Sequence, residues 1–114
     1  MKIRQISIEN QIELYKRYRH TTPADIKQQA LEYLKNGYTI AYHKSCQTDR
    51  IDESKGIPCS DSARHTDGEW AWSSELIYYL ENYNIPLPQD FISHMENSSW
   101  TVDKEKARYI AGLF

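Results

Sequence analysis

Two tryptophans two residues apart, Trp70 and Trp72, constrain the fold of this chain more than any other sequence feature. In a strand both indole rings point to the same face, which then carries a large apolar area. The Asp67-Gly68 pair before them is a turn signal, and residues 74–83 after them have apolar side chains at helical spacing. The sequence therefore predicts a strand whose tryptophan face is buried under the helix that follows.

Capping residues and apolar spacing predict that most of the chain forms short helices. Ser7, Thr22 and Asp103 are expected N-caps. Pro23 opens a helix that Asn36-Gly37 ends, and Pro88 opens another. The predicted helices cover residues 8–20, 23–35, 74–83, 88–96 and 104–111, and the predicted strands cover 38–43, 69–72 and 100–102. We expect an α+β fold with four to five short helices packed around a small antiparallel sheet.

A chain of 114 residues has the length of one domain and can bury its own core. We therefore expect a single globular domain over residues 1–114, with a long polar loop at about 44–68. The longest apolar run, 76–80, is far too short to cross a bilayer, and no apolar stretch follows the N-terminal charges. These features predict a cytoplasmic protein without a membrane partner. Cys46 and Cys59 are then expected as thiols, with a disulfide between them as the alternative.

Charge is distributed unevenly along the chain, although the formal net charge is only -2. Residues 45–103 contain eleven acidic residues and three Lys or Arg, whereas the segments on either side have a basic excess. An acidic surface attracts basic partners and repels nucleic acid. The pattern predicts contact with a basic protein, and a solvated acidic surface without a partner is the alternative.

A small zinc- or Cys-dependent enzyme is the first alternative function. His43 and Cys46 are close in sequence, and Cys59 and His65 lie further along the chain, so the four could hold tetrahedral zinc. The spacing matches no standard zinc finger, because only one pair is close. The same residues could also supply a Cys–His nucleophile pair. We predict no metal, no cofactor and no catalytic residue, and keep the enzyme as an alternative.

A nucleic-acid-associated regulator is the second alternative function. Lys16, Arg17 and Arg19 alternate with Tyr15 and Tyr18 near the end of the first predicted helix. The two tryptophans could in addition stack on bases or sugars. A solvated helix end and a buried core explain the same residues, and phosphate contacts need more Lys and Arg than the middle of the chain offers. No nucleic-acid partner is therefore expected.

One stretch of the sequence has a distinctive pattern. It runs Thr66-Asp67-Gly68-Glu69-Trp70-Ala71-Trp72, then Leu76 with Tyr78-Tyr79, then Ile85-Pro86-Leu87-Pro88 with Phe91, Ile92 and His94. It resembles a group of small bacterial proteins with the pattern TDG-W-W, L-x-Y-Y and LP-x-x-F-x-x-H, which look like immunity proteins of polymorphic toxin systems. The resemblance covers about residues 66–95, and Ser73 stands where proline is expected. It implies an immunity function and carries over no catalytic residue.

Charge and resemblance together lead to one functional prediction. We expect a cytoplasmic immunity protein that binds and occludes a cognate basic toxin domain, for which a nuclease is a candidate, through an acidic face. The expected contact residues are Asp49, Asp52, Glu53, Asp61, Asp67, Glu69, Tyr78 and Tyr79. The two tyrosines are adjacent on a helix and cannot face the same way, so one is expected in the core and one at the rim of the interface.

Overall fold

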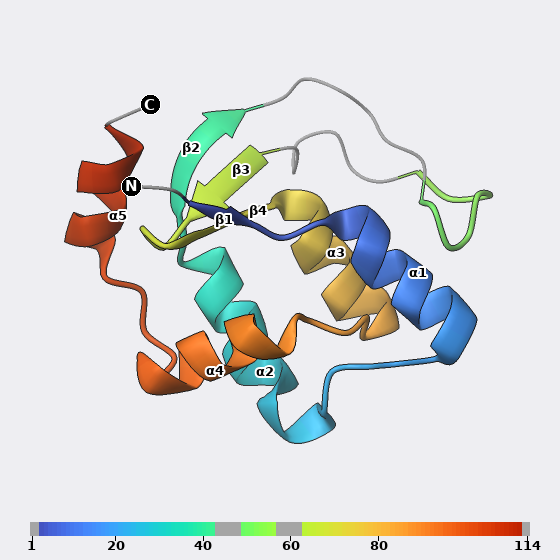
Figure 1. Ribbon diagram of the computed structural model, residues 1–114. Coiled ribbons are helices and arrows are strands. Elements are labelled where there is room, and N and C mark those ends of the chain that lie inside the picture. The colour runs from blue at the N-terminus through green and yellow to red at the C-terminus, as the bar shows by residue number, and fades with distance from the viewer. Residues whose placement is uncertain (1–2, 43–48, 57–62, 113–114) are drawn as a thin grey trace.

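The computed structural model describes residues 3–42, 49–56 and 63–112 (Figure 1). Its helices are α1 (Ile8–Tyr18), α2 (Ala24–Lys35), α3 (Ser74–Tyr83), α4 (Gln89–Asn97) and α5 (Lys104–Ala111). Its strands are β1 (Arg4–Gln5), β2 (Tyr38–Tyr42), β3 (Ala63–Thr66) and β4 (Trp70–Ser73). The prediction of an α+β fold with short helices around a small sheet is confirmed.

The four strands form one sheet in the order β1-β4-β3-β2. β3 pairs antiparallel with both neighbours, so that Thr66 lies opposite Tyr38 on one side and Ala71 on the other. The prediction of an antiparallel sheet is wrong at one end, because β1 runs parallel to β4. Arg4 pairs there with Trp70, which is distant in the sequence, so no local pattern indicated this strand.

Local sequence signals place most helix ends where they were expected. The Ser7 hydroxyl accepts a hydrogen bond from the first turn of α1, and the Asp103 carboxylate accepts one from the first turn of α5. α2 ends at Lys35, directly before Asn36-Gly37. The prediction of Thr22 as the cap of α2 is wrong. Thr22 is buried, and its hydroxyl donates to the Ile85 carbonyl oxygen at 2.7 Å, which ties the start of α2 to the segment after α3.

Two further secondary-structure predictions are wrong. β3 lies inside the segment 44–68, for which the sequence predicts a loop, because its hydrogen bonds come from strands on both sides rather than from local spacing. Residues 100–102 form no strand. Ser99 and Trp100 have φ values of 54° and 58°, in the left-handed region, and so turn the chain between α4 and α5 instead of extending it.

The core forms on the tryptophan face of the sheet. Trp70 and Trp72 are buried, and their rings lie 5.1 and 5.6 Å from the ring of Phe91 on α4. The indole N–H of Trp72 donates to the Leu34 carbonyl oxygen of α2 at 3.1 Å. The prediction that the tryptophan face is core is therefore confirmed, and the rings are not available to stack on a ligand.

The opposite face of the sheet is covered in part by α5. Ala71 alternates with the two tryptophans, points to this face and is fully buried. Figure 1 shows α5 apart from the other four helices, beside β2, and it buries Ala107 and Ile110. Within the described residues no helix is long and apolar enough to cross a membrane.

Candidate functional site

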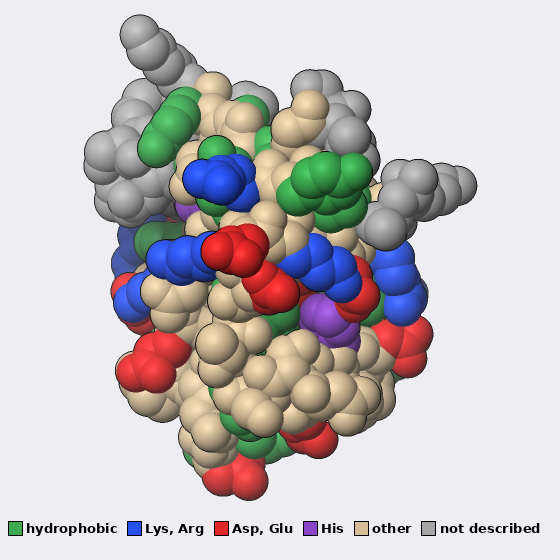
Figure 2. Space-filling view, turned by 90° about the vertical axis from the view of Figure 1, so that its left-hand side faces the viewer, with side chains coloured by type: hydrophobic (Ala, Val, Ile, Leu, Met, Phe, Trp, Pro, Cys, Tyr) green, Lys and Arg blue, Asp and Glu red, His purple; other side chains and the backbone are tan. Residues whose placement is uncertain are grey.

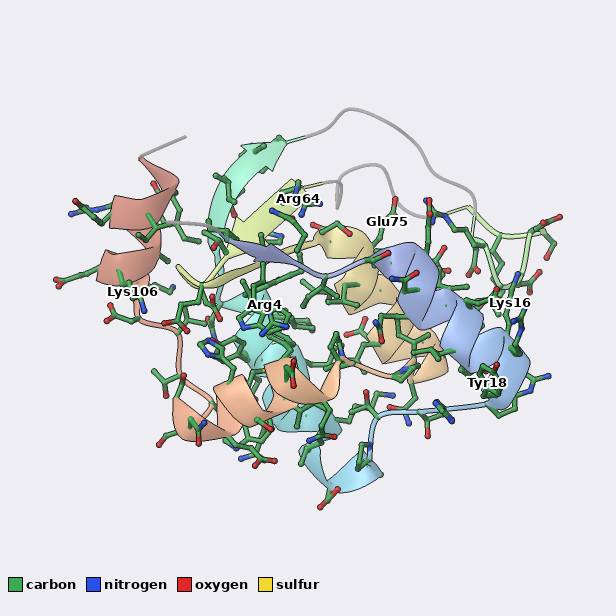
Figure 3. The ribbon with its side chains drawn as sticks, viewed as in Figure 1. Arg4, Lys16, Tyr18, Arg64, Glu75 and Lys106 are labelled. Carbon is green, nitrogen blue, oxygen red and sulfur yellow. The ribbon has the colours of Figure 1, made fainter. Side chains whose placement is uncertain are left out.

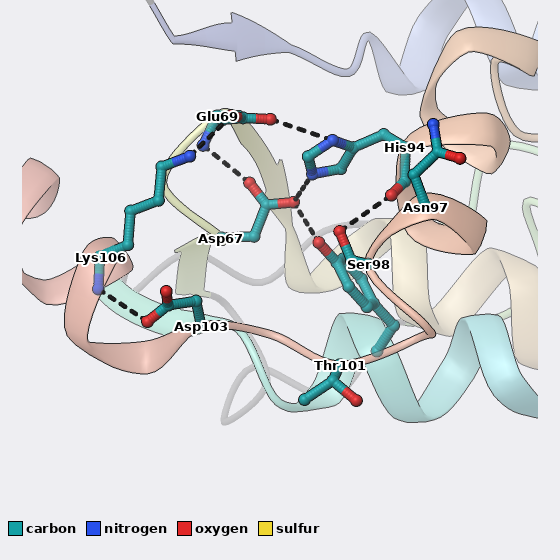
Figure 4. A pocket seen from close by; sticks show the side chains of 9 residues that line it. Asp67, Glu69, His94, Asn97, Ser98, Thr101, Asp103 and Lys106 are labelled. Atoms are coloured by element: carbon teal, nitrogen blue, oxygen red, sulfur yellow. Dashed lines mark hydrogen bonds and ion pairs between the residues drawn. The ribbon is translucent and has the colours of Figure 1, made fainter.

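A polar hollow opens where the β3–β4 turn, α4 and α5 meet (Figure 4). Its lining residues are Tyr33, Asp67, Glu69, His94, Asn97, Ser98, Thr101, Asp103 and Lys106. Several residues of the sequence pattern converge here, because Asp67 from one end of that pattern contacts His94 from the other. In this hollow, residues from the two ends of the sequence pattern therefore contact each other.

Asp67 is the centre of the cluster. Its side chain is almost fully buried, and Oδ1 accepts the backbone N–H groups of Glu69 at 2.8 Å and Trp70 at 2.7 Å. Oδ2 accepts the hydroxyl of Tyr33 and faces Nε2 of His94 at 2.9 Å. Burial raises the pKa of Tyr33, and the Asp67 carboxylate raises it further, so the tyrosine remains a hydrogen-bond donor. Both carboxylate oxygens are thus fully used inside the protein.

His94 has carboxylates on both sides of its ring. Nε2 faces Asp67, and Nδ1 lies 3.0 Å from Oε2 of Glu69. A neutral imidazole has one N–H, so only the imidazolium form can donate to both carboxylates. The other oxygen of Glu69 lies 2.6 Å from Nζ of Lys106 on α5. The chain of contacts therefore joins α2, the β3–β4 turn, α4 and α5.

The contacts of this cluster join elements of the fold to one another, and we call the cluster the clamp. Both ring nitrogens of His94 lie against carboxylates, which come from the β3–β4 turn. Within the described residues no group of three or more His, Cys, Asp or Glu side chains is placed to hold a metal ion. The arrangement is suited to holding four elements in one geometry.

A second polar cluster forms around Asp49. Its carboxylate is fully buried and accepts the N–H groups of Ile51 and Asp52 at 2.8 and 2.9 Å. It also accepts the hydroxyls of Tyr78 and Tyr83 on α3, each at 2.7 Å. Burial would raise the pKa of Asp49, but these hydrogen bonds outweigh it and lower the pKa below the usual value.

The tyrosine hydroxyls of α3 respond to the same carboxylate. The hydrogen bond to Asp49 raises the pKa of Tyr78 to about 12, and it raises the pKa of Tyr83 as well. The hydroxyl of Tyr79 accepts the backbone N–H of Arg50 at 2.8 Å. Three tyrosines of one helix thereby hold the loop 49–56 against α3.

Ion pairs mix the charges that the sequence separates. Arg4 pairs with Asp90 at 3.2 Å, Lys35 with Glu81 at 3.1 Å, and Lys106 with Glu69, so the basic segments neutralise acids of the middle block. Figure 4 shows Lys106 beside Glu69, and Figure 2 shows basic and acidic side chains alternating across one face. Among the described residues, these three acids of the block therefore pair with bases instead of adding to one acidic face.

The eight predicted contact residues fall into two separate places. Asp49, Asp52, Glu53, Tyr78 and Tyr79 belong to the loop 49–56 and α3, whereas Asp67 and Glu69 belong to the β3–β4 turn on the other side of the molecule (Figure 1). Asp61 lies outside the described residues. A single flat face containing all of them is excluded by this placement.

Burial corrects three of these predictions. Asp49, Asp67 and Tyr79 are buried and cannot form part of an exposed contact surface, because each is used in the internal hydrogen bonds described above. Glu53 is exposed, while Asp52 and Tyr78 are partly exposed. Tyr79 in the core and Tyr78 at its edge match the expected division between the two tyrosines. Glu69 is exposed but already paired with His94 and Lys106.

The alternative sites have different outcomes. His43, Cys46 and Cys59 lie outside the described residues. His65 is half-buried in β3, where its ring nitrogens lie 3.2 Å from the Thr39 hydroxyl and 3.0 Å from the Ser74 hydroxyl. Burial lowers the pKa of His65, with Arg64 as a second cause. Both ring nitrogens thus have partners within the fold.

Most of the basic and aromatic residues at the end of α1 are exposed, whereas Tyr15 is partly buried against the core. Arg17 pairs with Glu13 at 2.8 Å, and the Arg19 guanidinium lies 5.7 Å from the ring centre of Tyr15. Lys16 and Tyr18 project from the same end of the helix (Figure 3). Positive charge at a helix C-terminus is stabilising in itself, so the patch has a structural explanation.

Sequence reasoning did not assign roles to Tyr33, His94 or Lys106. The sequence gives no signal for Tyr33 or Lys106 beyond their places in two predicted helices. His94 closes the distinctive sequence pattern, which was the one available hint of its importance. All three reach Asp67 or Glu69 from elements distant in the sequence, so their meeting depends on tertiary packing.

Comparison with protein-family models, with curated proteins and with solved structures finds no match to this chain.

Proposed function

We propose that this protein is a bacterial, cytoplasmic immunity protein that binds a basic toxin domain and occludes its active site. The observation that supports the proposal is the loop 49–56, whose buried Asp49 carboxylate is held by two backbone N–H groups and two tyrosine hydroxyls. Beyond this anchor the loop presents Asp52 and Glu53 to solvent. A loop held in one conformation loses little entropy on binding.

The loop also holds itself in shape. The Asp52 carboxylate accepts the backbone N–H and the hydroxyl of Ser54, at 3.1 and 2.6 Å, and the Lys55 N–H donates to the Asp52 carbonyl oxygen. The N–H of Asp49 in turn donates to the Lys55 carbonyl oxygen at 3.0 Å, which closes the loop. The loop is therefore preorganised. Lys55 lies 4.0 Å from Asp52, so Glu53, which is exposed at the tip, is the acid we assign to contact with a basic surface.

Partly exposed side chains of α3 extend the surface beside this tip. Ile77 and Tyr78 are both partly exposed, and Tyr78 contacts Asp49 directly. Aromatic side chains with one polar end are favoured in the centre of protein interfaces, and acidic groups around them raise the association rate with a basic partner. We place the toxin contact on the loop tip, Ile77 and Tyr78.

The test is capture of the partner from lysate of the native host with the tagged full-length chain, followed by mass spectrometry. We expect a stoichiometric basic protein whose toxicity is suppressed on co-expression. Glu53→Lys leaves the hydrogen bonds of Asp52 in place and should slow the association several-fold and weaken the dependence of the rate on salt. Glu96→Lys is the matched control, because Glu96 is exposed on a helix away from the loop. Unchanged binding by the loop variant would refute this surface, and the absence of any basic partner would refute the function.

A further inference from the structure

Among the described residues, β2 is the outer strand at one edge of the sheet, with α5 beside it. It is the last strand in the order β1-β4-β3-β2, and across residues 3–42, 49–56 and 63–112 no strand pairs with its outer side. Its sequence is Tyr-Thr-Ile-Ala-Tyr, without charge and without proline. Lysine, proline and charge are the usual means by which an edge strand avoids pairing with another chain.

The opposite edge of the sheet is protected. β1 has only two residues, Arg4 and Gln5, and both are polar and exposed. Arg4 in addition lies over the Trp70 ring at 4.0 Å and pairs with Asp90. On β2 the one irregularity is a bulge between Thr39 and Ala41, which bends the strand but places no charge on it. The two edges therefore differ in their capacity to pair.

Exposed aromatic side chains gather at the β2 edge. Tyr42 is 79% exposed, Tyr38 is 36% exposed, and Tyr109 on the adjoining α5 is 71% exposed. These are three of the four exposed large hydrophobic side chains among the described residues. Figure 2 shows hydrophobic side chains on the upper part of this side of the molecule. An edge strand flanked by exposed tyrosines can bury their rings against a partner as well as form backbone hydrogen bonds.

We propose that two copies of this chain associate through antiparallel pairing of β2 with β2 of the second copy. Charge favours a second copy as the occupant, because two uncharged edges meet without repulsion, whereas a basic partner would find no acidic side chain on this strand. A two-fold axis closes such a pair, so that only the protected β1 strands remain as edges. The loop 49–56 lies away from β2 (Figure 1), and the pairing is independent of the proposed function.

The experiment is sedimentation equilibrium of the full chain over a wide concentration range. We expect a reversible monomer–dimer equilibrium, and slower hydrogen exchange of the Tyr38–Tyr42 amides in the dimer. Thr39→Lys/Ala41→Lys places like charges across the pair and should weaken dimerisation about tenfold or more. Gln29→Lys/Gln89→Lys adds the same charge at exposed positions outside the sheet and should leave the dimer unchanged.

A second variant covers the case in which the double substitution disturbs folding. Tyr42→Lys changes a highly exposed side chain, so it should keep the fold while weakening the dimer in the same direction. A wild-type chain that is monomeric at every concentration overturns the proposal. A dimer that persists in folded Tyr42→Lys and Thr39→Lys/Ala41→Lys variants also overturns it, because the contact must then lie elsewhere.

Discussion

Asp67 joins His94 to Tyr33, since one carboxylate oxygen accepts the tyrosine hydroxyl and lies 2.9 Å from Nε2 of the histidine. We expect Asp67→Asn to lower the free energy of unfolding by about 1–3 kcal/mol. The asparagine Oδ1 can still accept the backbone N–H groups of Glu69 and Trp70. Its NH2 group would stand where Oδ2 of Asp67 accepts the Tyr33 hydroxyl, so that hydrogen bond would be lost. Urea denaturation measures the loss. Asp90→Asn is the control, because Asp90 is highly exposed in its pair with Arg4 and its loss should cost about 1 kcal/mol or less. Equal effects of the two variants would contradict the clamp.

Asp49 should make the protein sensitive to acid. Its pKa in the fold is lower than the usual 3.8 of the unfolded chain, so its stabilising effect is complete above pH 3.8 and is lost as the pH falls through the lower folded value. Asp49→Asn should lower stability near neutral pH by about 1–3 kcal/mol and reduce the acid dependence. Urea titrations at pH 7 and at pH values below 4 measure both effects. Hydrogen exchange reports on the loop itself. If the backbone amides of residues 50–55 exchange as slowly in Asp49→Asn as in the wild type, the anchoring role is contradicted.

His65 should contribute a dependence of stability on mildly acidic pH. Burial lowers its pKa in the fold, so below the usual 6.5 the unfolded chain binds a proton that the folded chain resists, and stability falls. Above pH 6.5 the contribution is constant. Glutamine does not titrate and can still form a hydrogen bond to Thr39 or Ser74. In His65→Gln the melting temperature should therefore fall less steeply than in the wild type as the pH is lowered below 6.5. His20→Gln, at an exposed position, is the comparison variant, and an equal flattening by both would rule out His65 as the source.

Gly37 is required by the packing of Trp72. A Cβ at this position would lie 2.6 Å from Cζ2 of the buried indole and 3.0 Å from Cβ of His65. Gly37→Ala should therefore destabilise the fold by about 1–3 kcal/mol, because the ring cannot move within the core. Gly56→Ala is the matched control, since no atom lies within 4 Å of its Cβ position. Thermal and urea unfolding of the two variants give the comparison, and similar stabilities would show that the core tolerates the methyl group.

Gly68 is required for a different reason. Its φ is 99°, which L side chains rarely adopt, and an added Cβ would lie 3.0 Å from Cγ of Lys106. Gly68→Ala should destabilise the fold by about 1–2 kcal/mol and loosen the contact between the turn and α5. Hydrogen exchange of the α5 amides should then increase relative to those of α1. Exchange that is unchanged in α5 would mean that the turn does not hold this helix.

Secondary structure was predictable wherever it depends on nearby residues. Ser7 and Asp103 cap their helices, and Asn36-Gly37 follows the end of α2, because each of these signals acts over a few residues. β1 and β3 were missed because their hydrogen bonds come from residues far along the chain. Thr22 was misassigned for the same reason: its hydroxyl has a distant partner, the Ile85 carbonyl, in place of the helix start.

The candidate site shows the same division. Asp67 and Glu69 were picked out as acidic residues beside a turn, but the sequence could not show that Asp67 is buried under Tyr33 and His94. Asp49 was expected on an exposed acidic loop and instead anchors that loop from within. In both cases a carboxylate attracts donors from another element, and the buried carboxylate is tolerated only because those donors are present.

By itself the sequence determined the fold class, the core role of Trp70 and Trp72 and most helix limits, because capping and apolar spacing act locally. Only the tertiary structure decided where the charges lie. The chain carries its acids in the middle and its bases at the ends, yet folding places Arg4 beside Asp90 and Lys106 beside Glu69. The attraction between two charges depends on their distance in space and not on their separation along the chain. The packing of the elements therefore decided which acidic and basic side chains became neighbours.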